Sequence, residues 1–126
     1  MAQELPAHLR SDCPINASID LFGDRWSLLI VREILLDDKH KYGELAAMAE
    51  GIPTNILAGR LKRLTQAGIL ERCIYQERPP RYEYHLTEKG RDLGPILREM
   101  ISWGLKYVPG TGKSKVPINL AEISQK

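Results

Sequence analysis

Positive charge is concentrated in the middle of this chain, where it can bind phosphate. Between residues 54 and 81, six cationic side chains stand against two anionic ones, a local balance of +4. The whole chain carries only +2, so the remainder sums to −2. A basic segment in a nearly neutral body is the electrostatic footprint expected of a protein that binds nucleic acid. The cationic residues are Arg60, Lys62, Arg63, Arg72, Arg78 and Arg81.

The pattern of residues 54–67 predicts a helix that reads DNA bases. Leu57, Leu61 and Leu64 recur at positions i, i+4 and i+7, so they share one face and can anchor the helix in a core. The opposite face is polar, and Asn and Lys side chains can bond to base edges in the major groove. The alternative is the ordinary solvated face of a surface helix. We predict DNA contact, mostly at base edges, by Thr54, Asn55, Ala58, Gly59, Lys62 and Arg63.

A hairpin is predicted directly after this helix. Residues 69–76 and 81–86 are rich in β-branched and aromatic side chains, which favours two strands. The four residues 77–80 between them include Pro79 and Pro80, which cannot donate to a strand ladder and therefore predict a loop. Arg78 and Arg81 at this tip are placed for contact with phosphate or the minor groove. The alternative is a solvated turn.

Cys13 is the candidate for redox chemistry. It precedes Pro14 where the first helix is predicted to begin, and the free amides and dipole of a helix start favour a thiolate. A thiolate is the form that oxidants attack. The alternative is a small, inert, buried side chain. Cys73, in the first predicted strand, lacks a helix-end setting, and we expect it to be structural.

The sequence contains no convincing pattern for a nucleotide-binding, metal-binding or catalytic site. Residues 110–114 imitate the end of a phosphate-binding Walker loop, but the first glycine of that pattern would fall on Tyr107, and the segment follows a helix rather than a strand. His8, His40 and His85 are scattered and have no partner at a metal-ligand spacing. We therefore expect no catalytic residues, no metal and no cofactor, and we predict that the chain is not an enzyme.

The elements that must position these residues follow a familiar order. Tyr42 and Leu45 belong to a short helical pattern, Gly51 allows a turn at positive φ, and Pro53 and Thr54 open the next helix with Thr54 as its N-cap. With the hairpin behind it, this is the layout of a winged helix-turn-helix. The predicted fold class is mainly α with a small antiparallel β-hairpin as the wing.

The flanking helices predict a dimer. A helix over residues 88–107, capped by Thr87 and bent or restarted at Gly94-Pro95, carries a wide apolar stripe. An upstream helix places Ile15 and Ile19 on one face. We predict that the first and last helices join two copies, with DNA half-sites about 34 Å apart or a multiple of that. The alternative is that the stripe belongs to the monomer core. The stripe consists of Leu93, Ile96, Leu97, Met100, Ile101, Trp103 and Val108.

Length and composition indicate one domain. With 126 residues and 43% hydrophobic content, we expect an N-terminal arm at 1–12, the winged domain with its dimerisation helices at 13–108, and a flexible tail at 109–126. The longest apolar run is far shorter than a membrane span or a signal-peptide core. Two cysteines are too few for a disulfide framework. We expect a cytoplasmic protein without a membrane partner.

Short motifs, in order and at matching spacing over residues 13–108, resemble the signature of HxlR-type bacterial transcriptional regulators, which are winged helix-turn-helix proteins similar to the MarR group. The resemblance implies a homodimer on an operator with two half-sites, and it implies that Cys13 can respond to oxidants or electrophiles. The chain departs from the pattern at Pro53, where the family often has Ser, and at Ala58, where it often has Thr. The motifs are Cys13-Pro14, Gly23-Asp24-Arg25-Trp26, Tyr42-Gly43-Glu44-Leu45, Gly51-Ile52, Leu57-Ala58-Gly59-Arg60-Leu61, Gly68-Ile69-Leu70-Glu71-Arg72, Pro79-Pro80-Arg81-Tyr82-Glu83-Tyr84 and Leu86-Thr87-Glu88-Lys89-Gly90.

Two functions compete at this stage. The first is a sequence-specific regulator bound to double-stranded DNA as a homodimer, with an oxidant, a small molecule at the dimer interface or no effector at all. The second is a winged domain used for protein contact without specific DNA binding, since fold alone does not determine function. Replacing Lys62, Arg63 or Arg78 with Ala distinguishes them, because only a DNA-binding protein needs these charges for phosphate and groove contacts.

Overall fold

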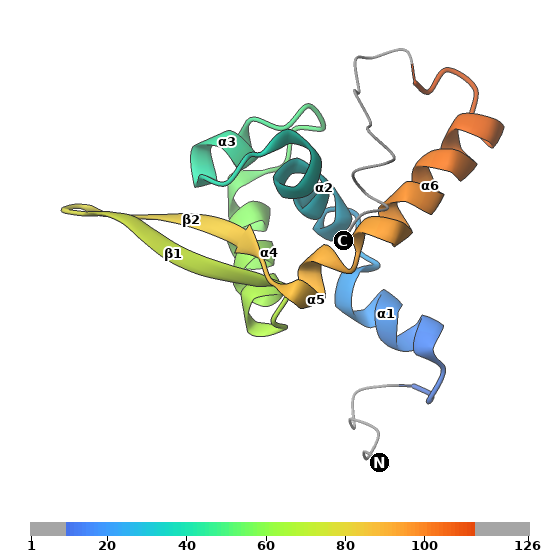
Figure 1. Cartoon of the computed structure of the whole chain (residues 1–126), viewed down its shortest axis with the longest axis horizontal. Helices are drawn as coiled ribbons and strands as arrows, with labels where there is room; N and C mark the ends of the chain where they lie inside the picture. The colour runs from blue at the N-terminus through green and yellow to red at the C-terminus, as the bar shows by residue number, and fades with distance from the viewer. Residues whose placement is uncertain (1–9, 113–126) are drawn as a thin grey trace.

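The computed structural model describes residues 10–112 and arranges six helices and one hairpin within that range. The elements are α1 (Pro14–Phe22), α2 (Ser27–Asp37), α3 (Tyr42–Ala46), α4 (Thr54–Gln66), β1 (Leu70–Glu77), β2 (Pro80–Leu86), α5 (Glu88–Arg91) and α6 (Gly94–Tyr107) (Figure 1). The predicted fold class, mainly α with an antiparallel hairpin wing, is confirmed. None of these helices is long and apolar enough to cross a membrane. Much of the predicted arm (1–9) and tail (113–126) lies outside the described residues, as do Lys113 and Ser114 of the Walker-like segment.

The core lies where α2, α4 and the base of the hairpin meet. Leu57, Leu61 and Leu64 of α4 are between 0% and 1% exposed, which confirms them as the anchoring face of that helix. They pack in one cluster with Ile30 and Val31 of α2, both fully buried. Burying side chains of this size stabilises the fold by about 1.5–3 kcal/mol each. The opposite face of α4 is therefore directed to solvent.

The turn between α1 and α2 is closed by one carboxylate. Asp24 accepts hydrogen bonds from the backbone amides of Trp26 and Ser27, both at 3.0 Å, and from the Ser27 hydroxyl. Its Oδ2 also accepts from Nε of Arg60 on α4 at 2.9 Å. Burial acts to raise the pKa of Asp24, but the hydrogen bonds from Ser27, Trp26 and Arg60 outweigh it and hold this pKa below its ordinary value. Asp24 thus joins the start of α2 to the middle of α4.

The α3–α4 turn differs from the prediction in one detail. Gly51 has φ of +73°, as expected for this turn. However, Pro53 is the N-cap of α4 and Thr54 is its first helical residue, so the prediction of Thr54 as the cap was wrong. The fixed φ of proline suits it to a helix start, which displaces the threonine by one position. Tyr42 of α3 donates its hydroxyl to the carbonyl oxygen of Thr54 at 3.0 Å and so ties the two helices together.

The hairpin has a shorter loop than the sequence suggested. Its register pairs Leu70 with Leu86 at the base and Glu77 with Pro80 at the tip, and an irregularity lies between Ile74 and Gln76. The loop is therefore only Arg78 and Pro79, rather than residues 77–80. Proline is tolerated as the first residue of a strand, because no ladder bond needs its missing donor there.

His40 fastens the hairpin to the α2–α3 loop. Its carbonyl oxygen accepts from the backbone amide of Tyr84 at 2.8 Å, its ring Nδ1 lies 2.9 Å from the Tyr84 carbonyl oxygen, and its Nε2 lies 2.6 Å from an Asp38 carboxylate oxygen. The ring also stacks on His85, with centroids 4.4 Å apart. Burial acts to lower the pKa of His40, but the Tyr84 carbonyl and the Asp38 carboxylate outweigh it and raise this pKa.

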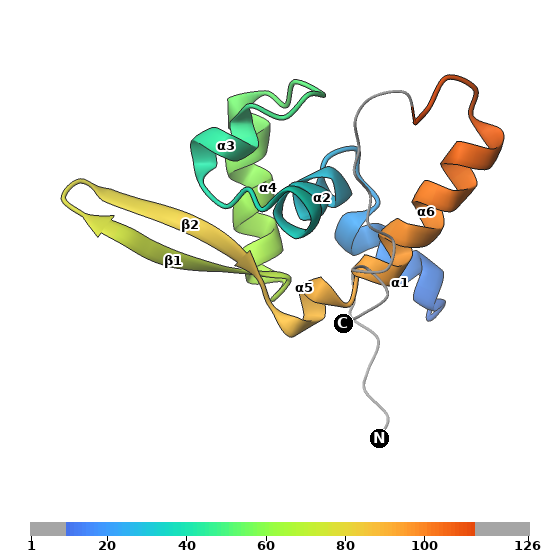
Figure 2. The same cartoon turned by 45° about the horizontal axis from the view of Figure 1, so that its top comes forward.

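The predicted C-terminal helix is interrupted near Gly94-Pro95, as expected. α5 is a single turn capped by Thr87, whose side-chain oxygen accepts from the Gly90 amide at 3.1 Å. Gly90 is buried against Ile69, the residue before β1, and a Cβ at that position would collide with the carbonyl oxygen of Ile69. α6 then leads away from the hairpin, so that α1 and α6 lie at the end of the molecule opposite the wing (Figures 1 and 2).

Replacing Asp24 by Asn tests the role of its charge. We expect Asp24→Asn to lower the free energy of unfolding by about 2 kcal/mol at neutral pH, since hydrogen bonds to charged groups contribute about 1.5–3 kcal/mol. The pKa of Asp24 is depressed on folding, so its contribution is complete above the unfolded value of 3.8 and is lost as pH falls through the folded pKa. Urea unfolding at several pH values measures the difference in unfolding free energy between the wild type and Asp24→Asn. This difference should become smaller only below about pH 4.

The matched control is Asp12→Asn, which neutralises an exposed carboxylate just before α1. It should change the unfolding free energy by less than about 0.5 kcal/mol. If the difference in unfolding free energy between the wild type and Asp24→Asn stays constant down to about pH 2, a role for the carboxylate charge is contradicted.

Candidate nucleic-acid interface

One side of α4 is exposed along its whole length, and we call it the reading face. The six predicted DNA-binding residues of this helix are all exposed on it, while the leucines on the other side are buried. Thr54 and Asn55 lie in the first turn, next to Tyr42 of α3, and the remaining residues extend through the following turns. The sequence pattern therefore brings these side chains together on one surface. The reading face consists of Thr54, Asn55, Ala58, Gly59, Lys62 and Arg63.

Gly59 is unusual on this face because the folded chain does not require a glycine there. It lies inside α4, and no heavy atom lies within 4 Å of the position that a Cβ would take. A glycine inside a helix costs about 1 kcal/mol relative to alanine. Glycine does, however, allow another molecule to approach the backbone closely. The cost is understandable if something outside this chain packs against the helix at that point.

A groove separates α4 from the hairpin. Its volume is about 400 Å³, and Ala58 and Lys62 line its helical side. Arg72 and Tyr84, direct cross-strand partners in the hairpin, line the other side. The Arg72 guanidinium lies 4.0 Å from the centroid of the Tyr82 ring, which holds this cation at the surface. The groove is thus bordered by cationic side chains from both elements.

Arg72 and Tyr84 were missed as site residues by sequence reasoning. Sequence reasoning used Arg72 as a unit of charge and Tyr84 as one of the aromatic residues of the second strand, and both as members of family motifs, but neither as a residue that contacts DNA. The signal that could have found them is the hairpin register, because residues paired across a hairpin share one face. A basic and an aromatic residue opposite one another, next to a basic helix, indicate a groove for a phosphate backbone.

Two arginines of α4 are directed toward the N-terminal part of the chain. Arg60 is paired with Asp24, as described above, and belongs to the scaffold. The Arg63 guanidinium donates to the carbonyl oxygen of Asp20 in α1. Arg63 is exposed but is held beside α1, whereas Lys62 borders the groove on the side of the hairpin. The reading face is therefore flanked by α1 on one side and by the wing on the other.

Arg78 and Arg81 lie at the tip of the wing, away from α4 (Figure 1). Both are exposed, and the loop is braced by Gln76, whose side-chain amide donates to the Pro79 carbonyl at 3.1 Å. A strand of seven residues spans about 23 Å, so the tip lies well beyond the groove. The structure does not bring these arginines into one cluster with the reading face. A duplex that lay along α4 could meet both, because a double helix is longer than this separation.

Both cysteines of the chain are free and exposed. Cys13 is the N-cap of α1, where its carbonyl oxygen accepts from the Ala17 amide at 3.0 Å. Cys73 lies on β1, where it pairs with Glu83. Among residues 10–112, no group of three or more His, Cys, Asp or Glu side chains is arranged to hold a metal ion.

Bacterial relatives of this chain are helix-turn-helix regulators. An uncharacterized HTH-type transcriptional regulator of Mycobacterium bovis is 39% identical over 95 residues, which cover 75% of this chain and 59% of that protein. The chain therefore spans about three fifths of the length of that relative. The uncharacterized HTH-type regulator YdeP of Bacillus subtilis is 34% identical over 95 residues, which cover 75% of this chain and 73% of YdeP.

Solved structures share the fold. The protein PA1607 matches with a TM-score of 0.75 at 34% identity, over 90% of this chain and 78% of its own. The redox regulator HypR in its oxidized form matches with a TM-score of 0.64 at 34% identity, over 75% of this chain and 96% of HypR. The reduced form of the transcriptional regulator YodB from B. subtilis matches with a TM-score of 0.63 at 34% identity, over 79% and 97%.

A family model agrees with these likenesses. The model of the HxlR-like helix-turn-helix matches residues 21–111, which include α2, the helix-turn-helix, the wing and α6. The match thus covers the reading face, the groove and the Asp24 turn. This chain belongs to the HxlR-like helix-turn-helix family of transcriptional regulators.

Proposed function

We propose that this protein regulates transcription by binding a specific operator sequence through the reading face of α4. The observation that carries the proposal is the combination of an exposed polar helix face, anchored by three buried leucines, with a groove bordered by Lys62 and Arg72. The helix face is suited to base edges in the major groove, and the cations are suited to the phosphates on either side. Gly59 then lets the duplex approach the helix backbone.

The wing extends this interface. We assign Arg78 and Arg81 to contacts with phosphate or the minor groove beside the major groove that α4 enters. Arg63, held next to Asp20, would meet the backbone on the other side of the helix. Phosphate contacts of this kind position the protein, while Thr54, Asn55, Ala58 and Gly59 select the sequence, and Lys62, which lies both on the reading face and at the groove, contributes to both.

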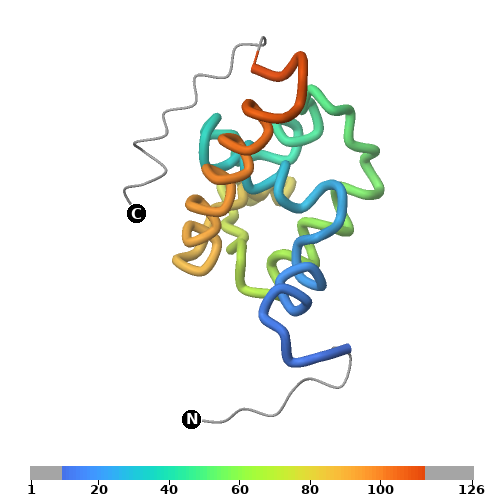
Figure 3. The backbone as a smooth tube through the Cα atoms, turned by 90° about the vertical axis from the view of Figure 1, so that its right-hand side faces the viewer, coloured from blue at the N-terminus to red at the C-terminus, as the bar shows by residue number. Residues whose placement is uncertain are grey.

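The protein acts as a homodimer in this proposal, joined through α1 and α6. None of the nine described residues of α1 is buried, and Ile15 and Ile19 are 70% and 53% exposed. On α6, Met100 and Trp103 are 52% and 62% exposed. Figure 3 looks onto this end of the molecule, where α1 and α6 face the viewer. A monomer rarely exposes so much apolar surface on two helices. Burial of this surface against a second copy of the chain is the simplest explanation.

Cys13 makes the regulator responsive to oxidants in this proposal. Its position at the start of α1 exposes the thiol and places it next to the proposed dimer interface. Oxidation there would add a bulky or bridging group at the junction of two copies. HypR, one of the structural neighbours, is a redox regulator, and YodB has been crystallised after diamide treatment and with a quinone bound.

Binding to DNA is tested with Lys62→Ala, measured by fluorescence anisotropy on the DNA upstream of the gene and on scrambled DNA. We expect a loss of about 1–3 kcal/mol in affinity for the upstream DNA and a salt slope smaller by about one, because Lys62 borders the groove. Lys106→Ala is the matched control, since it removes the same charge from α6. Equal and weak binding of the wild type to both DNAs, with no effect of Lys62→Ala, would favour a protein-contact domain instead.

The dimer is tested with Trp103→Glu, which puts a charge in the centre of the exposed stripe of α6. We expect the wild type to sediment as a dimer at micromolar concentration and the variant to sediment as a monomer, because an unpaired charge is costly to bury. Ser102→Glu makes the same change beside the stripe and should leave the dimer intact. A wild type of monomeric mass would refute the dimer.

The response to oxidants is tested with Cys13→Ser. This variant should bind upstream DNA as tightly as the wild type, but diamide should no longer change its affinity, because the reactive thiol is gone. Cys73→Ser removes the other exposed thiol and should keep the response. If diamide acts equally on the wild type and on Cys13→Ser, Cys13 is not the sensor.

A further inference from the structure

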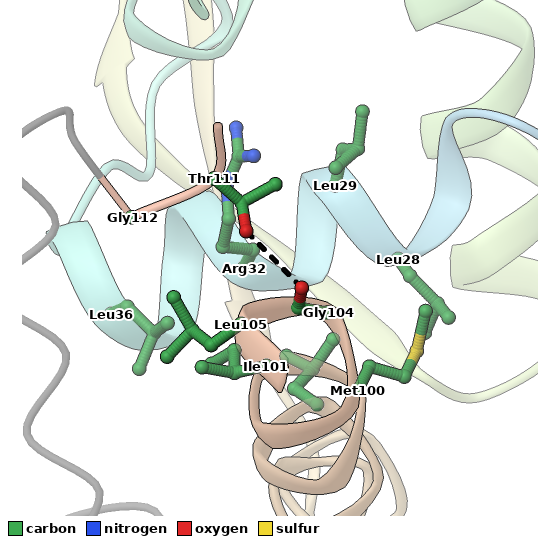
Figure 4. A pocket seen from close by; sticks show the side chains of 11 residues that line it. Leu28, Leu29, Arg32, Leu36, Met100, Ile101, Gly104, Leu105, Thr111 and Gly112 are labelled. Atoms are coloured by element: carbon green, nitrogen blue, oxygen red, sulfur yellow. Dashed lines mark hydrogen bonds between the residues drawn. The ribbon is translucent and has the colours of Figure 1, made fainter. Parts of the chain in front are cut away.

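A cavity of about 440 Å³ lies between α2 and α6, far from the reading face. Figure 4 shows side chains of the two helices converging on it from opposite sides. Cavities that hold small molecules have volumes of about 300–1,000 Å³ and mostly apolar walls. The main apolar lining residues are Leu28, Leu29 and Leu36 of α2 and Met100, Ile101 and Leu105 of α6.

The turn that follows α6 closes one side of the cavity. The Thr111 hydroxyl donates to the carbonyl oxygens of Gly104 at 3.1 Å and Val108 at 2.8 Å, which folds the chain back onto the helix (Figure 4). Gly112 has φ of +84°, and a Cβ there would press on the Leu105 side chain. Thr111 and Gly112 are therefore part of the wall of the cavity.

The charge of the lining restricts the chemistry of the occupant. Arg32 is the one charged residue among the described lining residues, and its guanidinium is already engaged. It makes two parallel hydrogen bonds to the Glu50 carboxylate, at 2.7 and 2.8 Å, and one to Glu33 at 3.1 Å. An anionic molecule would have to compete with Glu50 for this cation, and it would lose its hydration in the apolar part of the cavity. The cavity favours an uncharged, mainly apolar molecule.

The same ion pair connects the cavity to the DNA interface. Glu50 lies in the turn between α3 and α4, next to Gly51 and three residues before the N-cap of α4. Arg32 lies on α2, whose far side packs in the core against α4. A molecule in the cavity that displaces Arg32 would therefore also act on Glu50 and on the turn that positions the start of the reading face.

We propose that the α2–α6 cavity is an effector site for a small, uncharged, apolar molecule, and that its occupancy changes DNA affinity through the Arg32–Glu50 ion pair. The inference that DNA affinity changes rests on the proposed function. Binding of the molecule itself is separate from DNA binding and can be measured without DNA.

The probe is N-phenyl-naphthylamine, an uncharged fluorophore, compared with anilinonaphthalene sulfonate, which has the same rings and an added anionic group. We expect the full-length protein to bind one uncharged probe per chain and to bind the sulfonate at least about tenfold more weakly. Gly104→Leu fills the cavity without a clash at Cβ, because no heavy atom lies within 4 Å of that position. The affinity of this variant for the uncharged probe should be lower than that of the wild type by at least about tenfold.

Lys106→Leu is the matched control for this substitution, because it adds the same side chain to α6 outside the lining residues. It should bind the probe as the wild type does. Probe binding that survives in Gly104→Leu would overturn the site. A loss of probe binding as protein concentration rises would also overturn it, because a second copy would then cover the cavity.

The coupling is tested by repeating the anisotropy titration of upstream DNA with saturating probe. We expect the DNA affinity of the wild type to change by about fivefold or more. Glu50→Gln should bind the probe equally well but lose this change, because the charge that links the cavity to the turn is gone. Probe binding without any change in wild-type DNA affinity would overturn the coupling. Absence of specific DNA binding both without and with probe would instead refute the proposed function and leave the binding site standing.

Discussion

The carboxylate of Asp24 accepts hydrogen bonds from the neighbouring start of α2 and from Arg60, which lies 36 residues further along the chain. On one side it caps the start of α2, which carries the centre of the core, and on the other it holds Arg60 in the middle of α4. Because Arg60 is engaged in this ion pair, its charge holds α4 in position and is not directed to the reading face. The orientation of the reading face relative to α2 depends on this tie, because the leucine contacts on the other side of α4 are non-directional.

Sequence reasoning predicted the elements whose signals are local. The spacing of Leu57, Leu61 and Leu64 is a helical period, and the β-branched and aromatic content of the two strand segments favours strands, so both could be recognised within a few residues. The same reasoning was wrong about Thr54 as the cap and about Pro80 as a loop residue. In both cases a proline occupies a position that its ring tolerates, at a helix start and at a strand start, where the general rule against proline does not apply.

Sequence reasoning could not predict the contacts that join distant segments. His40 and Tyr84 are 44 residues apart, and Arg63 and Asp20 are 43 apart, so no periodicity relates them. The six residues of the reading face were found from the helix alone, but Arg72 and Tyr84 required the hairpin register. The difference between Lys62, free to border the groove, and Arg63, held beside α1, is likewise a property of the assembled fold.

Gly59 links the proposed interface to the amount of protein in the cell. A glycine in a helix costs about 1 kcal/mol, which is about a fivefold change in the ratio of folded to unfolded chains. Cellular proteases remove unfolded chains, so such a change alters steady-state abundance. The fraction of time that an operator is occupied depends on both affinity and abundance. Under the proposed function, a single residue on α4 would therefore act on operator occupancy in two opposite directions, through the contact it permits and through the number of folded molecules available to make it.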